Sequence, residues 1–233
     1  MNSKIAFILS GALIISSILF GMFVVVSRQQ EKSVRVVGLG TKNVVSDIAK
    51  WTIVLGQNTG IGNQQDGYRF LKKDLEKLAK FLKSNGIEDK DITVDPVTSY
   101  PNYGTNGITG YVFTQKISVK TTDLLKIEKM ALDTDSISSS GLVLQNSTIE
   151  YFISDLAALK SEMLAIATSD AKARAVEIAK SAGNKVGNLI SAKSGIFQIR
   201  QPLSNEISDY GVYDTSSKQK EVAVTVNAVF KLE

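Results

Sequence analysis

The stretch VAVTVNAVFKL, residues 222–232, alternates apolar with other side chains more regularly than the rest of the chain. A period of two places every second side chain on the same face of a β-strand. A strand with one apolar face is typical of antiparallel sheets, in which one face packs on a core and the other meets water. We therefore predict a half-buried strand whose inward side chains are Val222, Val224, Val226, Ala228, Phe230 and Leu232.

The composition is that of a globular protein and excludes several kinds of chemistry. Of the 233 residues, 43% are apolar and 21% are charged, and the formal net charge is +4 with a pI near 9.1. Cysteine and histidine are absent, which excludes a disulfide framework, a Cys/His zinc site, a thiolate nucleophile and a Ser-His-Asp triad. We accordingly expect a protein that is not an enzyme, with no catalytic residues, no cofactor and no metal. The weak, scattered positive charge does not indicate nucleic acid as a partner.

The N-terminus contains an uncharged apolar run, residues 5–27, that is long enough for a membrane span. As a helix its 23 residues would extend ~35 Å, against a hydrocarbon core of ~30 Å. A cleaved signal peptide is the alternative, but no small-x-small cleavage site precedes Arg28. We predict a signal anchor at 1–27 whose partner is the lipid bilayer, a linker at 28–33 and a folded domain at 34–233. The Lys/Arg count around the span leaves the side of the membrane open.

Strands and one helix are expected in the first half of the domain. Residues 34–38 and 47–55 are typical of strands, and 56–62 of a glycine-rich turn. A leucine stripe predicts a helix that Asn63 caps and that Asn85-Gly86 ends. Residues 92–97 predict a strand that lies at a sheet edge or contains a bulge, because Pro96 would interrupt a ladder. We expect a long turn at 100–110 and a strand at 111–120.

The second half begins with a short helix, capped by Thr121 or Thr122, that continues to Leu132. A polar loop at 133–140, a strand at 141–152 and a long helix from Ser154 to Ala182 follow. The inward stripe of that helix would include Leu156, Leu159, Met163 and Ile166. Residues 186–200 read as one long strand or a strand pair, and 202–220 as a mobile polar loop.

The order of these elements predicts an α+β fold of mostly antiparallel sheets packed with two main helices. Each helix is followed by paired strands, which suggests a loose β-α-β-β duplication with sub-lobes at 34–135 and 136–233.

Several short motifs resemble the SIMPL-domain family of bacterial and archaeal envelope proteins. Residues 36–40, Val-Val-Gly-Leu-Gly, are similar to that family's opening V-x-G-x-G strand, and Ser46-Asp47-Ile48-Ala49 stands where it has Pro-Asp-x-Ala. Further matches are Gly86-Ile87 with Asp91-Ile92-Thr93, Pro101-x-Tyr103 with Gly110-Tyr111, Ala171-x-Ala173-x-Ala175, and Ala182-Gly183 with Gly187. The departures are Ser46 in place of proline and a weak match over residues 133–140.

The resemblance implies an exported domain, periplasmic or on the outer face, that forms a ring-like or hollow homo-oligomer. Relatives include proteins linked to tolerance of oxidative stress and immunogenic proteins. The resemblance brings no catalytic residue set. Together with the span predicted at 5–27, the resemblance implies a single-pass protein of the cytoplasmic (inner) membrane with its domain outside the cytoplasm.

Three hypotheses for function follow. The first is a non-enzymatic, membrane-anchored envelope protein that self-assembles into a homo-oligomeric scaffold linked to envelope stress tolerance. The second is an adaptor that captures another envelope protein or a ligand through residues 100–110 or 202–220. The third is a hydrolase that uses Asp91 and Asp95, which share a predicted strand face; solvated charge on an edge strand is the simpler interpretation. Gly38 and Gly40 favour close packing over nucleotide binding, because no third glycine or helix follows them.

Overall fold

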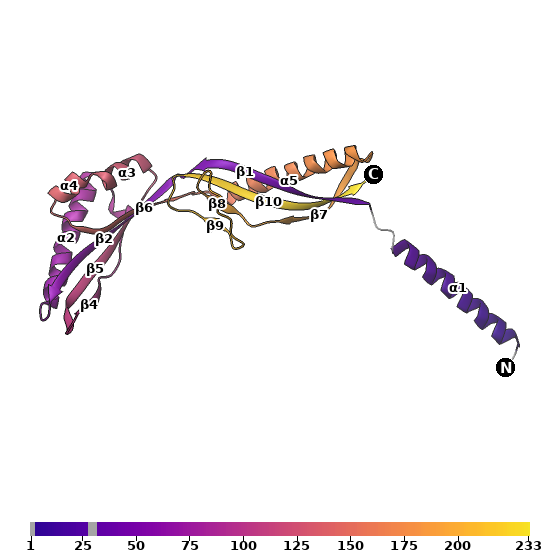
Figure 1. The fold of residues 1–233 in the computed structure, drawn as a ribbon, viewed down its shortest axis with the longest axis horizontal. Coiled ribbons are helices and arrows are strands. Elements are labelled where there is room, and N and C mark those ends of the chain that lie inside the picture. Colours follow the sequence, from indigo (N-terminus) through magenta and orange to yellow (C-terminus); the bar gives the residue numbers. More distant parts are fainter. Residues whose placement is uncertain (1–2, 28–31) are drawn as a thin grey trace. The chain divides into compact units, whose positions relative to one another are not determined.

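The computed structural model describes residues 3–27 and 32–233, with side chains at 11–23 and 32–233 (Figure 1). The helices are α1 (Ser3–Ser27), α2 (Gln64–Ser84), a 3-10 turn η1 (Asp89–Asp91), α3 (Leu124–Leu132), α4 (Thr134–Ser139) and α5 (Leu156–Ser181). The strands are β1 (Ser33–Val45), β2 (Ile48–Gly60), β3 (Ile92–Val94), β4 (Thr98–Gly104), β5 (Gly107–Thr121), β6 (Leu144–Phe152), β7 (Val186–Ser194), β8 (Gln198–Arg200), β9 (Val212–Tyr213) and β10 (Gln219–Leu232). Among residues 11–23 and 32–233, whose side chains are described, no helix meets the length and apolarity needed to cross a membrane.

The strands form two five-stranded sheets, which confirms the α+β class. One sheet has the order β1-β10-β8-β9, with β7 also paired to β10; the other has the order β3-β5-β2-β6, with β4 paired to β5. The pairs β10–β7, β10–β8, β2–β5, β2–β6, β3–β5 and β4–β5 are antiparallel. The short pair of β8 and β9 is parallel. Each sheet combines strands from both halves of the domain, since β1 joins β10 and β6 joins β2. The pairing of strands therefore differs from a simple sequential duplication.

The chain divides into two compact units. We call residues 1–40, 164–195 and 225–233 unit 1, and residues 41–163 and 196–224 unit 2. The elements β1, α5 and β10 contribute residues to both units.

Unit 2 holds a core between α2 and the β2-β5 pair. Strand β2 pairs with β5 over twelve residues, from Ala49↔Thr121 to Gly60↔Gly110. The predicted alternation is confirmed, because the side chains of β2 that point to α2 are buried, as are the leucines of the helix stripe. These residues are Ala49, Trp51, Ile53 and Leu55 on β2, and Leu71, Leu78 and Leu82 on α2. The indole Nε1–H of Trp51 donates to Ser147 Oγ at 2.9 Å, which assigns Trp51 to the core.

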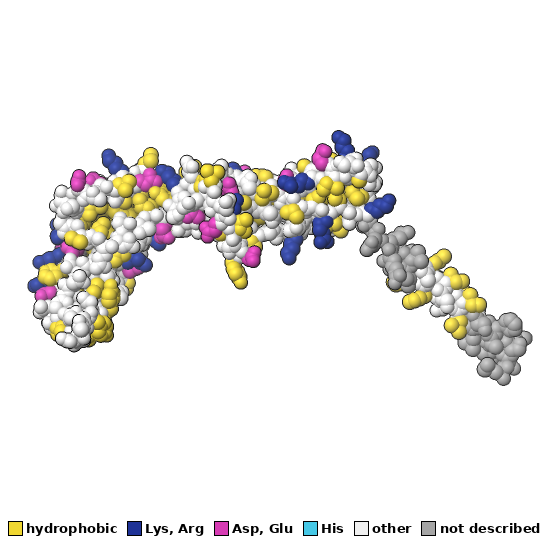
Figure 2. Space-filling model, in the orientation of Figure 1, with side chains coloured by type: hydrophobic (Ala, Val, Ile, Leu, Met, Phe, Trp, Pro, Cys, Tyr) yellow, Lys and Arg dark blue, Asp and Glu magenta, His cyan; other side chains and the backbone are white. Residues whose placement is uncertain are grey.

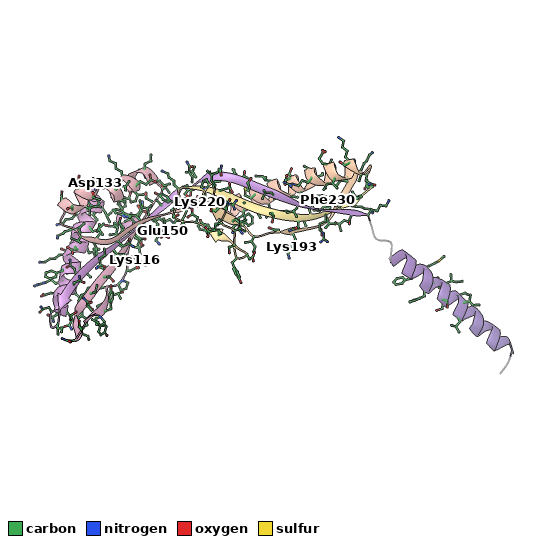
Figure 3. All side chains as sticks on the ribbon, viewed as in Figure 1. Lys116, Asp133, Glu150, Lys193, Lys220 and Phe230 are labelled. Atoms are coloured by element: carbon green, nitrogen blue, oxygen red, sulfur yellow. The ribbon has the colours of Figure 1, made fainter. Side chains whose placement is uncertain are left out.

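Unit 1 packs the second half of α5 on β1 and the end of β10. Alanines four residues apart form the buried stripe of the helix, namely Ala167, Ala171, Ala175 and Ala179. Small side chains allow a helix to approach a sheet closely, and Val226, Ala228 and Phe230 of β10 are buried. Figure 3 labels Phe230 on this strand. Gly183 ends the helix with φ of +71°, as the sequence predicts.

Three expected loops are shorter than predicted. Residues 56–62 are mostly strand, because β2 continues to Gly60 opposite β5 and only residues 61–62 turn. Residues 100–110 form a hairpin of β4 and β5 that turns at residues 105–106. The prediction of a long turn over this segment was therefore wrong. The polar segment 133–140 contains α4, which Asp133 caps by accepting the Ser136 N–H, and which buries Ile137.

Several caps and one core residue also differ from the prediction. The side chain of Asn63 makes no capping hydrogen bond. Asp123, and neither threonine before it, caps α3. Asp155 caps α5 by accepting the Ala158 N–H, because Ser154 instead donates to Asp47. Ile166 is exposed, since the turn of the helix places Ala167 inward.

Candidate functional site

A groove runs along unit 1 beside strand β1 and helix α5. It is open to solvent and has a volume of about 1020 Å³, near the upper end of the range for small-molecule pockets. Strand β1 lies at one end of the sheet order, so its second edge has no partner strand among the described residues. The groove therefore follows a sheet edge, where unpaired backbone groups can receive another chain.

Close contact between Gly38 and α5 sets the position of the helix next to this edge. A Cβ atom added at Gly38 would lie 2.1 Å from the Ala167 carbonyl oxygen and 2.5 Å from the Ala171 nitrogen. The helix also supplies Asp170, whose Oδ2 accepts the Leu39 N–H at 2.7 Å and the Arg174 Nε–H at 2.7 Å. These hydrogen bonds hold the pKa of Asp170 below its usual range, and the one from Leu39 has the largest effect.

The lining of the groove is apolar with cations at its rim. Val37, Val176 and Ile178 are 48%, 42% and 51% exposed, so the lining includes apolar side chains that meet solvent. Arg35 and Lys172 also line the groove, and neither has an ion-pair partner among the described residues. Glu177 is the single acidic side chain in the lining. An apolar floor with a basic rim is suited to an apolar group that carries negative charge.

Positive charge extends over unit 1 as a whole. Its residues from Lys32 onward carry eight basic and three acidic side chains, whereas unit 2 carries 17 and 19. The basic residues are Lys32, Arg35, Lys172, Arg174, Lys180, Lys185, Lys193 and Lys231, and the acidic ones are Asp170, Glu177 and Glu233. Dark-blue side chains accordingly lie around α5 and β7 in Figure 2. Composition statistics of the whole chain conceal this asymmetry.

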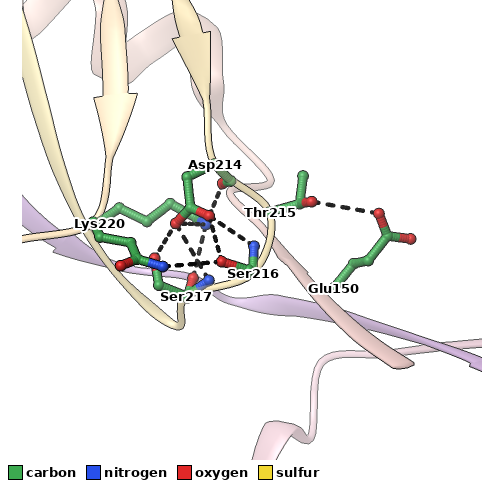
Figure 4. A network of polar contacts seen from close by, with 7 residues as sticks. Glu150, Asp214, Thr215, Ser216, Ser217 and Lys220 are labelled. Atoms are coloured by element: carbon green, nitrogen blue, oxygen red, sulfur yellow. Dashed lines mark hydrogen bonds and ion pairs between the residues drawn. The ribbon is translucent and has the colours of Figure 1, made fainter. Parts of the chain in front are cut away.

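Unit 2 contains a buried lysine, Lys220, in a polar network (Figure 4). Its Nζ donates to the carbonyl oxygens of Asp214 and Ser217, at 2.5 and 2.7 Å, and lies 3.7 Å from Asp214 Oδ2. Burial lowers the pKa of Lys220, and the negative charge of Asp214, which acts in the opposite direction, only partly offsets this effect. The sequence placed this residue in a mobile loop, but it belongs to β10 and closes the segment 214–218 onto that strand.

Asp214 is held ionised by the same segment. Burial alone would raise its pKa, but hydrogen bonds from Ser217 and Ser216, with the charge of Lys220, lower it to about 2. The amino group of Lys220 donates to two carbonyl oxygens, so it is committed to holding the segment. Lys220 therefore has a structural role, and its amino group is not available as a base.

The residues suggested for hydrolysis do not form a site. Asp95 pairs with Lys116 at 2.9 Å, and Asp91 belongs to η1, outside strand β3. Nowhere in the described part of the chain do three His, Cys, Asp or Glu side chains group so as to hold a metal ion. Gly38 serves close helix packing, as its sequence context favours.

The two segments suggested for capture of a partner both present aromatic or apolar side chains to solvent. Tyr100 and Tyr103 are exposed on β4. In the loop between β8 and β9, Leu203 and Tyr210 are 96% and 99% exposed. The groove itself was missed, although one signal was present. Once the alanine stripe is turned inward, Lys172, Val176 and Ile178 fall on the outer faces of the helix.

Comparison with known proteins gives a family match and several distant structural alignments. Residues 34–230 match the family described as "SIMPL: Protein of unknown function (DUF541)". A hydantoinase/carbamoylase family amidase from Burkholderia ambifaria is 14% identical, with 46% of this chain and 28% of that one covered and a TM-score of 0.24. A hydantoinase/carbamoylase family amidase from Burkholderia phymatum is 13% identical, with coverages of 50% and 30% and a TM-score of 0.24.

An uncharacterized conserved protein from Listeria innocua is 8% identical, with 80% of this chain and 92% of that one covered and a TM-score of 0.24. The chain spans less than a third of the length of the two amidases. No curated protein matches it. Structural alignments at these TM-scores carry no conclusion about fold or activity.

Proposed function

Because the chain belongs to the SIMPL family, we propose that it is a non-enzymatic envelope protein that is anchored in the membrane and associates with copies of itself. Residues 5–27 would lie in the cytoplasmic membrane, and the domain would lie on its extracytoplasmic side. The observation that carries the proposal is helix α1, whose large apolar side chains between Leu13 and Phe23 are exposed.

Helix α1 supports an anchor through its length and its exposed surface. Its 25 residues extend about 37 Å at 1.5 Å per residue, and the sequence has no charge from Ile5 to Ser27. Large apolar side chains between Leu13 and Phe23 are 54% to 69% exposed, and they appear in yellow along the helix in Figure 2. Water is an unfavourable environment for such a surface, whereas lipid would cover it at no cost.

Membrane extraction and cysteine labelling test the anchor and its orientation. We expect the full chain to stay in the membrane pellet after alkaline carbonate extraction, and a chain lacking residues 1–27 to be released. The sequence has no cysteine, so a single Asn188→Cys change on exposed β7 gives a unique label. An impermeant maleimide should react with it once the outer barrier is opened, whereas Ser3→Cys should react only after lysis. The reverse labelling pattern would refute the orientation.

Self-association is supported by the open edges of unit 1. The edge strand β1 exposes Val37 and Leu39, and β7 exposes Leu189 and Ile190. Exposed apolar edge strands favour pairing between chains. Anchoring raises the local concentration of such domains and restricts their orientation, so weak lateral contacts can suffice.

Light scattering of the full chain in detergent, corrected for the micelle, tests this association. We expect a particle of several chains at micromolar concentration. A particle of one chain across that range would contradict the proposal.

An adaptor role is a second candidate, favoured by the exposed Tyr100 and Tyr103 on the β4–β5 hairpin. Tyrosines are enriched where proteins bind each other. Purification of the full chain should then recover a partner at fixed stoichiometry. Tyr100→Ser with Tyr103→Ser should lose that partner, whereas Tyr68→Ser on α2 should retain it.

A further inference from the structure

We propose that the loop of residues 201–211 in one copy of the chain docks into the β1–α5 groove of a second copy. The proposal rests on the self-association proposed above and names the two surfaces that would produce it. The two surfaces are complementary in both hydrophobicity and charge. One is apolar and acidic, and the other is apolar and basic.

The loop presents three large apolar side chains to solvent. Leu203, Ile207 and Tyr210 are 96%, 73% and 99% exposed. In Figure 2 a projection beneath β9 carries hydrophobic and acidic side chains together at its tip. Leu203 also has φ of +65°, a left-handed conformation that a branched side chain rarely adopts. Strained, exposed apolar residues of this kind are typical of binding loops.

The backbone of the loop is held in place while these side chains face outward. Gln198 Nε2 donates to the Ser208 carbonyl oxygen at 2.8 Å, and Arg200 Nη1 donates to that of Glu206 at 3.3 Å. The Gly211 N–H donates to the Ser208 carbonyl oxygen at 3.0 Å. Ordering of the loop before contact reduces the entropy lost on binding.

The charges of the loop and the groove are opposite. Glu206 and Asp209 belong to the loop, and neither carboxylate has an ion-pair partner in the described part of the chain. Arg35 and Lys172 line the groove and are likewise without one. Val37, Val176 and Ile178 line the same groove and are exposed, so they are available to the apolar side chains of the loop.

Charge also determines how two copies can meet. Two identical basic grooves placed face to face would bring Arg35 and Lys172 close to their own counterparts, which like-charge repulsion opposes. Contact between the basic unit 1 of one copy and the acidic loop of unit 2 in the next has no such penalty. A contact of this kind is heterologous, so it generates rings where the rotation closes and open chains where it does not.

Charge reversal on each side, followed by exchange of the charges, tests the proposal on the full chain in detergent. The groove variant is Arg35→Glu with Lys172→Glu, and the loop variant is Glu206→Lys with Asp209→Lys. Two exposed pairs elsewhere serve as matched controls: Lys72→Glu with Lys80→Glu, and Glu76→Lys with Glu88→Lys. Mass photometry over a dilution series gives the distribution of oligomers for each variant.

We expect the groove and loop variants each to raise the apparent dissociation constant at least about tenfold, with both controls unchanged. A mixture of the two variants should assemble again into particles in which the two kinds of chain alternate, because the loop of each variant is then opposite in charge to the groove of the other. A chain that carries all four changes should assemble again, because the charges are exchanged.

Assembly that is unaffected by either variant would overturn the proposal. So would a loss of assembly in the four-change chain as severe as in the separate variants. If the unaltered chain is itself monomeric, the self-association of the previous section fails. If the unaltered chain assembles and the charge-reversal variants assemble equally well, only the proposed loop–groove contact fails.

Discussion

Asp170 Oδ2 accepts the backbone N–H of Leu39 at 2.7 Å, so a side chain of α5 fills a hydrogen-bonding position on the open edge of β1. The two residues are 131 positions apart in the sequence. Arg174, one turn further along the helix, donates to the same oxygen. This contact fixes the helix against the strand and partly satisfies an edge that is otherwise available to another chain.

We expect Asp170→Ala to lower the thermal unfolding midpoint at pH 7, because the Leu39 N–H loses a charged acceptor. The pKa of Asp170 is lowered in the folded protein. Its stabilising effect is therefore present above the ordinary carboxyl pKa of 3.8 and is lost as the pH falls through the folded-state value. The difference between variant and parent in scanning calorimetry should shrink below pH 3.8. Glu177→Ala on the same helix is the control, and a difference independent of pH would contradict the explanation.

Gly38→Ala should destabilise unit 1. The new Cβ atom would meet backbone atoms of α5 at Ala167 and Ala171, which can move only if the helix shifts. Overpacking of this kind typically costs about 1–3 kcal/mol. Gly60→Ala, with no heavy atom within 4 Å of the added Cβ, should stay within about 0.5 kcal/mol of the parent. Urea denaturation followed by far-UV circular dichroism measures both, and equal effects would exclude close packing as the cause.

The sequence predicted elements whose pattern is local and periodic. The alternation of β10, the alternation of β2 and the leucine stripe of α2 each place a buried face correctly. Helix α4 was missed because its six residues include one large apolar side chain, Ile137, among serine, threonine and aspartate, which favour loops. The β4–β5 hairpin was missed because its glycines, proline and asparagines are turn residues, although long pairing with β2 holds β5 as a strand.

The candidate site could not be predicted because it depends on contacts between distant segments. The groove exists only where Arg35 and Val37 of β1 meet Lys172 and Val176 of α5. Periodicity shows which face of α5 is alanine-rich, but it does not indicate which strand that face covers. The connection predicted from Pro202 to Lys220 is only partly a loop, because Val212–Tyr213 form β9 and β10 begins at Gln219. Its predicted end was wrong because the sequence does not distinguish a buried lysine such as Lys220 from a solvated one.

Asp214 should make stability depend on pH in the acidic range. Its pKa is about 2 in the folded protein and 3.8 ordinarily, a difference that corresponds to about 2 kcal/mol of stabilisation at neutral pH. That contribution is present above pH 3.8 and is lost as the pH falls toward 2. Asp214→Asn should therefore be less stable than the parent by this amount at pH 7, and the gap should close between pH 4 and pH 2. Glu76→Gln on the exposed face of α2 should follow the parent throughout.

Lys220 and Asp214 should behave as a coupled pair. Lys220→Met preserves the volume of the buried stem but leaves two carbonyl oxygens without a donor and Asp214 without its counter-charge. Each buried polar group left unpaired costs about 1–3 kcal/mol, so we expect a loss of at least that size in urea denaturation. We also expect the double variant, Lys220→Met with Asp214→Asn, to lose less unfolding free energy than the sum of the two single-variant losses. The shortfall should exceed about 0.5 kcal/mol, as it does for residues in one network. Because Trp51 lies in the core of unit 2, its fluorescence can follow the transition in all four chains. Additive losses would show that Lys220 stabilises the 214–218 segment through the carbonyl oxygens alone, without help from the carboxylate.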